Sequence, residues 1–463
     1  VRRWPPVAGG LLLAGLAVAG FFLVRALGER LPAPAAGLPA RAAAAGSGGV
    51  DTLLHVLLAL AVVVLTARLL AALFRLVHQP PVMGEVVAGI VLGPSVLGRL
   101  APDLSAFLWP PQVVPLLATI AQIGIIVYMF LVGLELNPAL LRRHSRATVA
   151  IAQASVALPF LLGTALALWL YPSLSRPGVP FTLFALFMGV AMSVTAFPVL
   201  ARILTDRELH KGPIGTMALA CAAVNDVAAW CLLAVVVSVA EAQASGAVVT
   251  VALAAAYAAL MLVAVQPAAR WLVRRCEGER GLTRGRLALV FTALLLSALA
   301  TEAIGIHALF GAFLLGAVIP HDSAVARELT ARLEDVVVVL LLPAFFASIG
   351  LRTELGLLGE AGSWLVCGAI VLAASAGKVG GTLLAARLAG LGWPQAAALG
   401  ALMNTRGLME LVVLSIGLEL GIVSPTLFTM LVVMALVTTL AATPCLDLLA
   451  RRYPEVAARD GAL

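Results

Sequence analysis

Two charged side chains stand in the middle of long apolar runs. Asp226 follows Asn225 in the run CAAVNDVAAW, and Lys378 lies in the run AGKVGGT. A charge at the centre of a bilayer costs about 2.5–3.5 kcal/mol on insertion scales, so such residues are candidates for ion or proton pathways. A buried carboxyl group can hold a proton, and its oxygens suit hard cations. We therefore expect Asp226 to be a site where H⁺ and a metal cation compete.

Lys378 is one of only two lysines in a chain that otherwise uses arginine for positive charge. Arginine stays protonated, whereas a lysine can lose its proton when it is desolvated. We expect Lys378 to compensate the charge of Asp226 in the ion-free state and to release it when a cation arrives. The alternative is a permanent Asp226–Lys378 ion pair that holds helices together, although buried pairs are often no more stabilising than apolar packing.

Two apolar segments are interrupted by residues that break helices. The first interruption runs from Ser193 to Pro198 and contains Thr195, and the second is Asn404-Thr405-Arg406-Gly407. Proline lacks an amide donor and disfavours helix just before it, and unwound backbone offers carbonyl oxygens and helix dipoles to an ion. We expect Thr195, the Asn225 carbonyl and these breaks to complete the cation site around Asp226. The alternatives are a plain proline kink and a glycine packing contact.

Glu302, His307 and Glu410 are secondary candidates. Glu302 and His307 flank Gly305, and we expect both to be buried, either in a water-lined feature or in a contact that anchors a helix. Glu410 is four residues after Arg406, a spacing that pairs the two side chains on one helix face.

Two further carboxylates have structural explanations. Glu85 follows Pro80-Pro81, where a carboxylate favours a helix N-terminus. Glu135 ends an apolar run close to an arginine cluster, and we expect it to be structural.

The composition requires a membrane protein. Of the 463 residues, 62% are hydrophobic and 11% are charged, and the mean hydropathy is +1.08, whereas about 25% of residues are charged in soluble domains. The five cysteines have no metal or disulfide spacing. No nucleotide-binding or catalytic motif is present, so we expect neither an enzyme nor a cofactor. The formal charge of +7 comes from short arginine clusters between apolar runs and does not indicate nucleic-acid binding.

Fourteen segments approach the roughly 20 apolar residues that cross a bilayer. We expect an N-terminal hydrophobic helix, either a signal peptide or a retained span, and a linker in residues 1–51, a transmembrane domain in 52–449 and a short tail in 450–463. The segments lie near residues 7–27, 52–76, 82–99, 113–134, 146–170, 181–204, 213–240, 247–271, 286–303, 304–320, 335–351, 362–389, 395–419 and 425–449.

The last thirteen segments divide into two sets of six around the single span 247–271. Basic residues concentrate on alternate connections, which predicts a cytoplasmic C-terminus and gives the two sets opposite orientations. Inverted repeats of this kind are typical of secondary transporters, whose sites lie where helices are interrupted. Both interruptions fall in the fifth span of their set.

These motifs resemble the monovalent cation:proton antiporter-2 family of the sodium/proton exchanger superfamily, which includes plant cation/proton exchangers and Kef-type potassium systems. The resemblance covers about residues 52–449. The motifs are Gln79–Glu85 (QPPVMGE) with Gly93-Pro94-Ser95, Val224–Val227 (VNDV), Thr301–His307 (TEAIGIH) and Asn404–Gly407 (NTRG).

The resemblance implies a thirteen-helix inverted-repeat fold with a dimerisation domain and a core domain that carries two crossed, interrupted helices. It also implies that Asp226 is the ion-binding acid, Lys378 the basic residue and Thr195 the threonine of the unwound helix. The chain differs from electrogenic bacterial members in having Asn225 before Asp226 where they have a second Asp. It also ends at Leu463, without the cytosolic nucleotide-binding domain of Kef-type members, so we expect no gating through such a domain.

We therefore predict an electroneutral antiporter that exchanges H⁺ for K⁺ or Na⁺. We expect a homodimer and a multi-pass location in a bacterial inner membrane. A channel-like cation pathway and a transporter of organic or anionic solutes on the same fold are the alternatives. The sequence does not distinguish Na⁺ from K⁺.

Overall fold

The computed structural model describes residues 18–29, 31, 52–135, 146–207, 209, 212–241, 247–277 and 282–453. This part of the chain is helical apart from turns, loops and one isolated bridge between Ser175 and Val423. Eleven of its helices are long and apolar enough to cross a membrane, and a bent pair brings the number to twelve. The all-α membrane fold is confirmed.

The thirteen-span count stays a prediction. The span expected at 304–320 is a helix of 11 residues, α15 (Ala308–Val318), which at 1.5 Å per residue is about 16 Å long and too short to cross alone. Of the expected N-terminal segment, the helix Val18–Gly28 is described. Residues 7–17, most of the linker and the tail after Tyr453 lie outside the described residues.

The remaining boundaries lie within a few residues of those expected, except that the helix expected at 335–351 begins at Ala324. The first set comprises α2 (Thr52–Leu76), α3 (Pro81–Leu92), α4 (Leu97–Leu100), α5 (Pro102–Leu108), α6 (Val113–Glu135), α8 (Arg146–Leu174), α9 (Phe181–Ser193), α10 (Phe197–Asp206) and α11 (Pro213–Glu241). The connecting span comprises α12 (Ala247–Leu260), the π-helical turn η1 (Met261–Val265) and α13 (Gln266–Glu277). The second set comprises α14 (Arg284–Ile304), α15, α16 (Ala324–Val336), η2 (Val337–Leu341), α17 (Leu342–Leu351), η3 (Leu355–Leu358), α18 (Ala361–Leu388), α19 (Trp393–Met403), α20 (Leu408–Glu419) and α21 (Pro425–Arg452).

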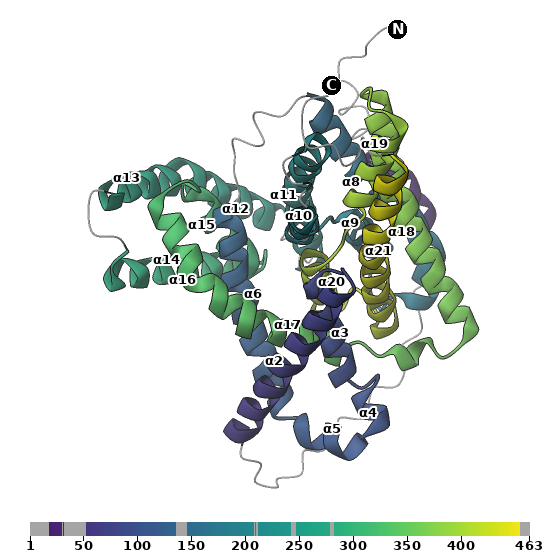
Figure 1. Cartoon of the computed structure of the whole chain (residues 1–463), viewed down its shortest axis with the longest axis horizontal. Coiled ribbons are helices and arrows are strands. Elements are labelled where there is room, and N and C mark those ends of the chain that lie inside the picture. Colours follow the sequence, from purple (N-terminus) through teal and green to yellow (C-terminus); the bar gives the residue numbers. More distant parts are fainter. Residues whose placement is uncertain are drawn as a thin grey trace.

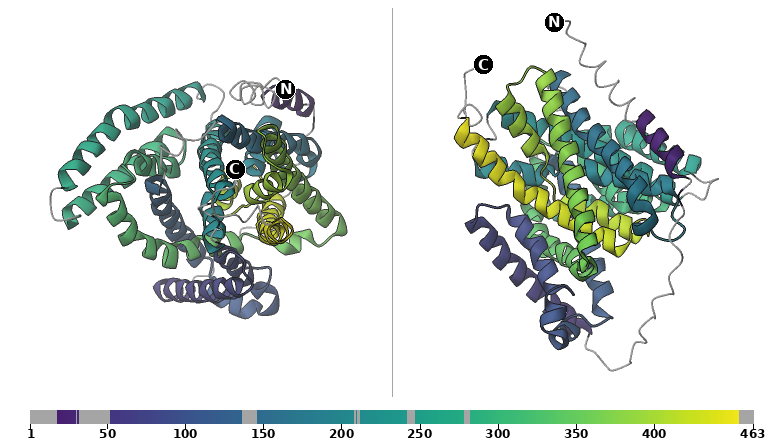
Figure 2. Two further views of the ribbon diagram at one scale, coloured as in Figure 1. Left: turned by 45° about the horizontal axis from the view of Figure 1, so that its top comes forward. Right: turned by 90° about the vertical axis from the view of Figure 1, so that its right-hand side faces the viewer.

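The helices pack as two groups. In the scaffold group (α2, α3, α6 and α12–α17), α6 packs on α15 and α17, and α3 packs on α2 and α17. In the core group (α8–α11 and α18–α21), α8 packs on α9, α11 and α18, and α21 packs on α18 and α19. Figure 1 shows α6, α14 and α15 on the left and α8, α18 and α21 on the right, and Figure 2 shows the same helices from two other sides. The division matches the two domains that the resemblance implies.

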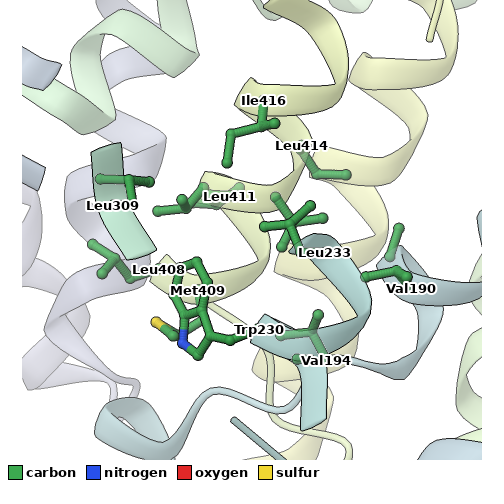
Figure 3. Close-up of a cluster of buried hydrophobic side chains, with 14 of the residues drawn as sticks. Val190, Val194, Trp230, Leu233, Leu309, Leu408, Met409, Leu411, Leu414 and Ile416 are labelled. Carbon is green, nitrogen blue, oxygen red and sulfur yellow. The ribbon is translucent and has the colours of Figure 1, made fainter. Parts of the chain in front are cut away.

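Aromatic side chains join the two groups next to Asp226. Trp230 lies one turn after Asp226 on α11, and its ring stacks on Phe313 of α15 with centroids 5.9 Å apart. Phe310 meets the same ring edge-on at 5.4 Å. Figure 3 shows Trp230 among buried side chains of α15 and α20, including Leu309, Leu408 and Met409. This apolar cluster therefore lies one turn beyond Asp226 on α11, between the two groups.

Glycines set the closest helix contact within the scaffold group. Gly350 of α17 lies against Gly89 of α3, and a Cβ added at Gly350 would stand 1.9 Å from the Gly89 carbonyl carbon. In a membrane, where helices do not associate through the hydrophobic effect, small residues let backbones approach and gain dispersion contacts.

Gly350→Ala should therefore force α3 and α17 apart. Overpacking of this kind costs about 1–3 kcal/mol, and the melting temperature of the purified protein in detergent should fall. Gly368→Ala is the matched control, because nothing lies within 4 Å of a Cβ at Gly368 in α18. Equal melting temperatures for the two variants would contradict this assignment.

Candidate cation site

The two predicted interruptions are present and touch each other. Helix stops at Ser193 and resumes at Phe197 in the first, and stops at Met403 and resumes at Leu408 in the second, where α19 and α20 are bent by 44°. The Ala196 amide donates to the Thr405 carbonyl oxygen at 3.1 Å. Thr195 Oγ1 donates to the Met403 carbonyl oxygen, also at 3.1 Å. Each interrupted helix thus satisfies backbone groups of the other.

The local sequence explains where the helices restart. Pro198 lies in the first turn of α10, where its missing amide costs nothing. Gly407 immediately precedes α20, and a Cβ there would lie 2.6 Å from Val199 Cγ2 of α10. A side chain at this position would push the two restarting helices apart.

Lys378 binds the end of the first half-helix and not the carboxylate of Asp226. Its ammonium donates to the carbonyl oxygens of Ser193, the last residue of α9, and of Ser155 at 2.9 Å. Lys378 and Asp226, both among the described residues, do not form an ion pair with a nitrogen–oxygen distance of 4.0 Å or less. The side chain is fully buried, and its charge still acts on Asp226. This geometry speaks against a permanent ion pair and favours compensation at a distance.

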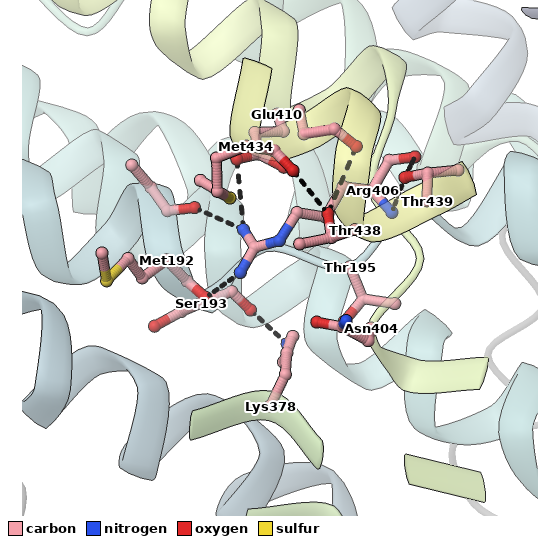
Figure 4. A network of polar contacts seen from close by, with 12 residues as sticks. Met192, Ser193, Thr195, Lys378, Asn404, Arg406, Glu410, Met434, Thr438 and Thr439 are labelled. Atoms are coloured by element: carbon pink, nitrogen blue, oxygen red, sulfur yellow. Dashed lines mark hydrogen bonds and ion pairs between the residues drawn. The ribbon is translucent and has the colours of Figure 1, made fainter. Parts of the chain in front are cut away.

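Arg406 binds the same helix end from the second interruption. Its guanidinium donates to the carbonyl oxygens of Ala191 at 2.9 Å and Met192 at 2.8 Å, and it pairs with Glu410 Oε1 at 3.1 Å (Figure 4). The expected Arg406–Glu410 pair is therefore present. Arg406 itself lies in the unwound stretch and not on the helix face that its spacing suggested. Thr439 of α21 bonds both the amide and the carbonyl of Arg406 at 2.7 Å.

Asp226 is the acid at this crossing that has no ion-pair partner among the described residues, whereas Glu410 is paired with Arg406. It lies near the middle of α11 and is 5% exposed. The amide of Phe197, which opens α10, is its backbone hydrogen-bond donor, so the positive end of that half-helix points at the carboxylate. Oδ1 is buried and has no hydrogen-bond partner in the described part of the chain. An oxygen of this kind can accept a proton or bind a cation.

Asn225 anchors the site. Its amide lies 2.8 Å from the Ser155 hydroxyl and 3.3 Å from the Thr195 hydroxyl. When the side-chain amide is turned so that its oxygen faces these hydroxyls, its nitrogen donates to the Ala152 carbonyl oxygen at 3.0 Å. Asn225 thus connects α11 to α8 and to the first interruption. Because its side-chain oxygen then accepts hydrogen bonds from the Ser155 and Thr195 hydroxyls, little of that oxygen's capacity is left to bind an ion.

Asn404 contributes a second free oxygen. Its Nδ2 lies 3.4 Å from Ser375 Oγ of α18, while Oδ1 is buried without a partner in the described residues. Figure 4 shows Asn404 beside Thr195, above Lys378. A neutral amide oxygen from the second interruption is therefore available next to the first.

A cavity of about 520 Å³ lies between the two groups on one side of the crossing. The scaffold group lines it with Glu85, Glu135 and Glu334, and α10 from Phe197 to Thr205 forms its core-group wall together with Leu408 of α20. Glu85 is buried and lies beyond the first turn of α3, so the expected helix-terminus role is wrong. Glu135, which we expected to be structural, also faces this cavity.

Glu302 and His307 lie elsewhere. Glu302 is exposed, contrary to expectation, and its carboxylate accepts from the Ala308 amide at 2.7 Å. His307 is half-buried with φ of 70°, and its Nδ1 lies 3.5 Å from the Leu309 amide. Both side chains cap α15 after Gly305, which fits the helix-anchoring alternative and not a place in the cation site.

Removing one partner of the buried Arg406–Glu410 pair should destabilise the fold by about 3–5 kcal/mol, because the other charge is left alone in the core. Arg406→Met should therefore lower the melting temperature strongly. The double variant Arg406→Met with Glu410→Leu should recover part of that loss, since no lone charge remains. If the double variant lost more stability than Arg406→Met and Glu410→Leu lose together when their separate losses are added, this interpretation would be contradicted.

Comparisons with known proteins identify the family and its fold. The sodium/hydrogen exchanger transmembrane family matches residues 58–451. The Na(+)/H(+) antiporter NhaS4 of Synechocystis is 44% identical over 409 residues, which cover 88% of this chain and 99% of that protein. The sodium proton antiporter MjNhaP1 of Methanocaldococcus jannaschii has a similar fold, with a TM-score of 0.63 at 14% identity over 86% of this chain and 99% of that one.

Longer relatives match over part of their length. Cation/H(+) antiporter 20 of Arabidopsis thaliana is 40% identical and K(+)/H(+) antiporter 1 of Saccharomyces cerevisiae is 35% identical, over 83% and 86% of this chain. The chain spans about half the length of these two proteins, 47% and 46%. From the family match and the extent of these similarities, the chain belongs to the sodium/hydrogen exchanger transmembrane family.

Proposed function

We propose that this protein is an antiporter in which Asp226 binds H⁺ and a monovalent cation, Na⁺ or K⁺, in turn. The observation that carries the proposal is the buried Oδ1 of Asp226, which has no partner among the described residues, while Lys378 is hydrogen-bonded to backbone carbonyls and Arg406 is paired with Glu410. A proton and a cation would compete for the same oxygen, so each would displace the other.

The surroundings of Asp226 support a site with neutral oxygen ligands. Thr195 Oγ1 and the free Asn404 Oδ1 are the neighbouring candidates from the two interruptions. Oxygen donors suit hard alkali cations. Two relatives are named for Na⁺ and K⁺ exchange, and the choice between these ions depends on ligand spacing in the loaded site.

The surroundings of Asp226 in the two directions along α11 support ion access from one side of the membrane at a time. The cavity follows α10 from Phe197 to Thr205, toward the end where α11 begins. In the opposite direction along α11, the packed rings of Trp230, Phe310 and Phe313 support a closed side. Movement of the core group against the scaffold group would exchange the open and closed sides, as expected for alternating access.

The arginine distribution supports a cavity that opens to the cytoplasm. Arg75 and Arg202 line the cavity. The last turn of α21, which carries Arg451 and Arg452, is expected on the same side of the membrane. We therefore place the C-terminus in the cytoplasm and the protein in a bacterial membrane. The homodimer remains a proposal that cross-linking in native membranes can check.

Asp226→Asn should abolish exchange, because an amide neither takes up a proton nor supplies a negative charge to a cation. Proteoliposomes loaded with a pH-sensitive dye should show cation-driven proton movement for the unmodified protein and none for this variant. Asp103→Asn, an exposed carboxylate on α5, should exchange normally. Normal exchange by Asp226→Asn would remove the proposed site. Ion conductance without obligatory proton flux would instead favour a channel.

Exchange should be electroneutral, because Asp226, the carboxylate at the crossing without an ion-pair partner among the described residues, accommodates one H⁺ or one monovalent cation. Glu410, the other buried acid there, is paired with Arg406. The initial rate in proteoliposomes should be the same with and without a membrane potential set by a thiocyanate gradient. Acceleration by a potential of one sign and slowing by the other would show net charge movement.

A further inference from the structure

We propose that the hydroxyl of Tyr128 is a ligand for the alkali cation as it passes between the cavity and Asp226. The inference rests on the proposed antiport and adds a residue from the scaffold group to a site otherwise built by the core group. None of the sequence motifs includes Tyr128, which lies within an apolar stretch of α6.

The first observation is the face of α6 that lines the cavity. Tyr128 and Glu135 are seven residues apart, which places them on one helix face about 10 Å apart along the axis. Both line the cavity, together with Leu131 and Val132 between them. Glu135 is exposed at the end of α6, and Tyr128 is half-buried two turns deeper. α6 therefore offers a carboxylate at the entrance and a phenol farther in.

The second observation is the wall that faces this phenol. Phe197 and Pro198, the first residues of α10, line the same cavity, and the amide of Phe197 is the donor to Asp226. The negative charges of Glu135, Asp226 and Glu334 all act on the Tyr128 hydroxyl. Tyr128 thus lies between the carboxylates of the cavity and the carboxylate of the site.

The third observation is that the hydroxyl is available. It makes no hydrogen bond to another group in the described part of the chain. Its neighbours on the core-group wall, including Phe197, Val199 and Leu408, present apolar side chains. Glu85 also reaches the cavity, but the charge of Arg68 acts on it. A neutral oxygen in this position can replace one water of a cation that is losing its hydration shell.

The sidedness follows from the packing. Tyr128 belongs to the scaffold group and Asp226 to the core group, so the two are neighbours while the cavity is open and separate when the core group moves. The hydroxyl should therefore affect cation affinity at the cavity face and not at the opposite face.

The test is Tyr128→Phe, which keeps the ring and removes the oxygen. Cation-driven proton movement is measured in everted and right-side-out membrane vesicles. Loss of one neutral ligand, which contributes about 1 kcal/mol to the binding free energy, should raise the half-saturating cation concentration about 3- to 10-fold at the cavity face. The half-saturating concentration at the other face and the maximal rate should be unchanged. Tyr171→Phe is the matched control, because its hydroxyl donates to the Val179 carbonyl oxygen at 2.6 Å, away from the cavity.

Each outcome is decisive. An unchanged half-saturating concentration at the cavity face overturns the role of Tyr128, provided that the unmodified protein exchanges ions and Asp226→Asn does not. An equal change at both faces, or a lower maximal rate with a lower melting temperature, also overturns it, because the ring hydroxyl would then act on the fold. Absence of exchange in the unmodified protein instead defeats the proposed antiport.

Discussion

The structure depends on the ends of two helices that stop inside the membrane. An interrupted helix leaves carbonyl groups at one end and amide groups at the other, and the bilayer core has no water to satisfy them. Here the carbonyl end of α9 is bound by Lys378 and Arg406, and the amide end of α10 faces Asp226. Glu410 lies in the first turn of α20, at the amide end of the other half-helix. Each buried charge thus opposes a helix dipole as well as another side chain.

This arrangement separates charges that are paired within the fold from Asp226, which has no ion-pair partner among the described residues. Arg406 is held by two carbonyl oxygens and Glu410, and Lys378 by two further carbonyl oxygens. Asp226 retains a buried oxygen without a partner among the described residues. Burying an unpaired acceptor is costly, which is a reason to expect that H⁺ or a cation occupies it in every working state. Obligatory occupancy is the basis of coupled exchange.

Much of this could be predicted from the sequence, because membrane helices and intramembrane charges leave strong signals. The span boundaries, the two interruptions and the candidacy of Asp226 follow from hydropathy, proline and glycine positions and the rarity of charge in apolar runs. The partners of those charges could not be predicted. Lys378 was expected to compensate the charge of Asp226, but its hydrogen bonds to the carbonyl oxygens of Ser155 and Ser193 were not expected, because sequence carries no record of which helix end lies beside a side chain.

Residues that function through tertiary position were also missed or misassigned. Tyr128 and Glu334 look like ordinary residues of their helices, and they gain meaning only from the cavity that α6, α16 and α10 enclose. Glu302 was expected to be buried because it flanks Gly305 between two expected spans, but it lies at the exposed end of α14. Helical periodicity is weak in these all-apolar segments, so the sequence did not indicate which face of each helix turns inward.

Competition between H⁺ and a cation for one carboxylate is tested most directly by proton release on cation binding. Purified protein in weakly buffered detergent solution is titrated with Na⁺ or K⁺ while the pH is recorded. We expect close to one proton released per cation bound at a pH below the midpoint of the protein's own protonation, falling to about half a proton at that midpoint, and neither binding nor release for Asp226→Asn. Saturable cation binding without proton release would contradict the shared site.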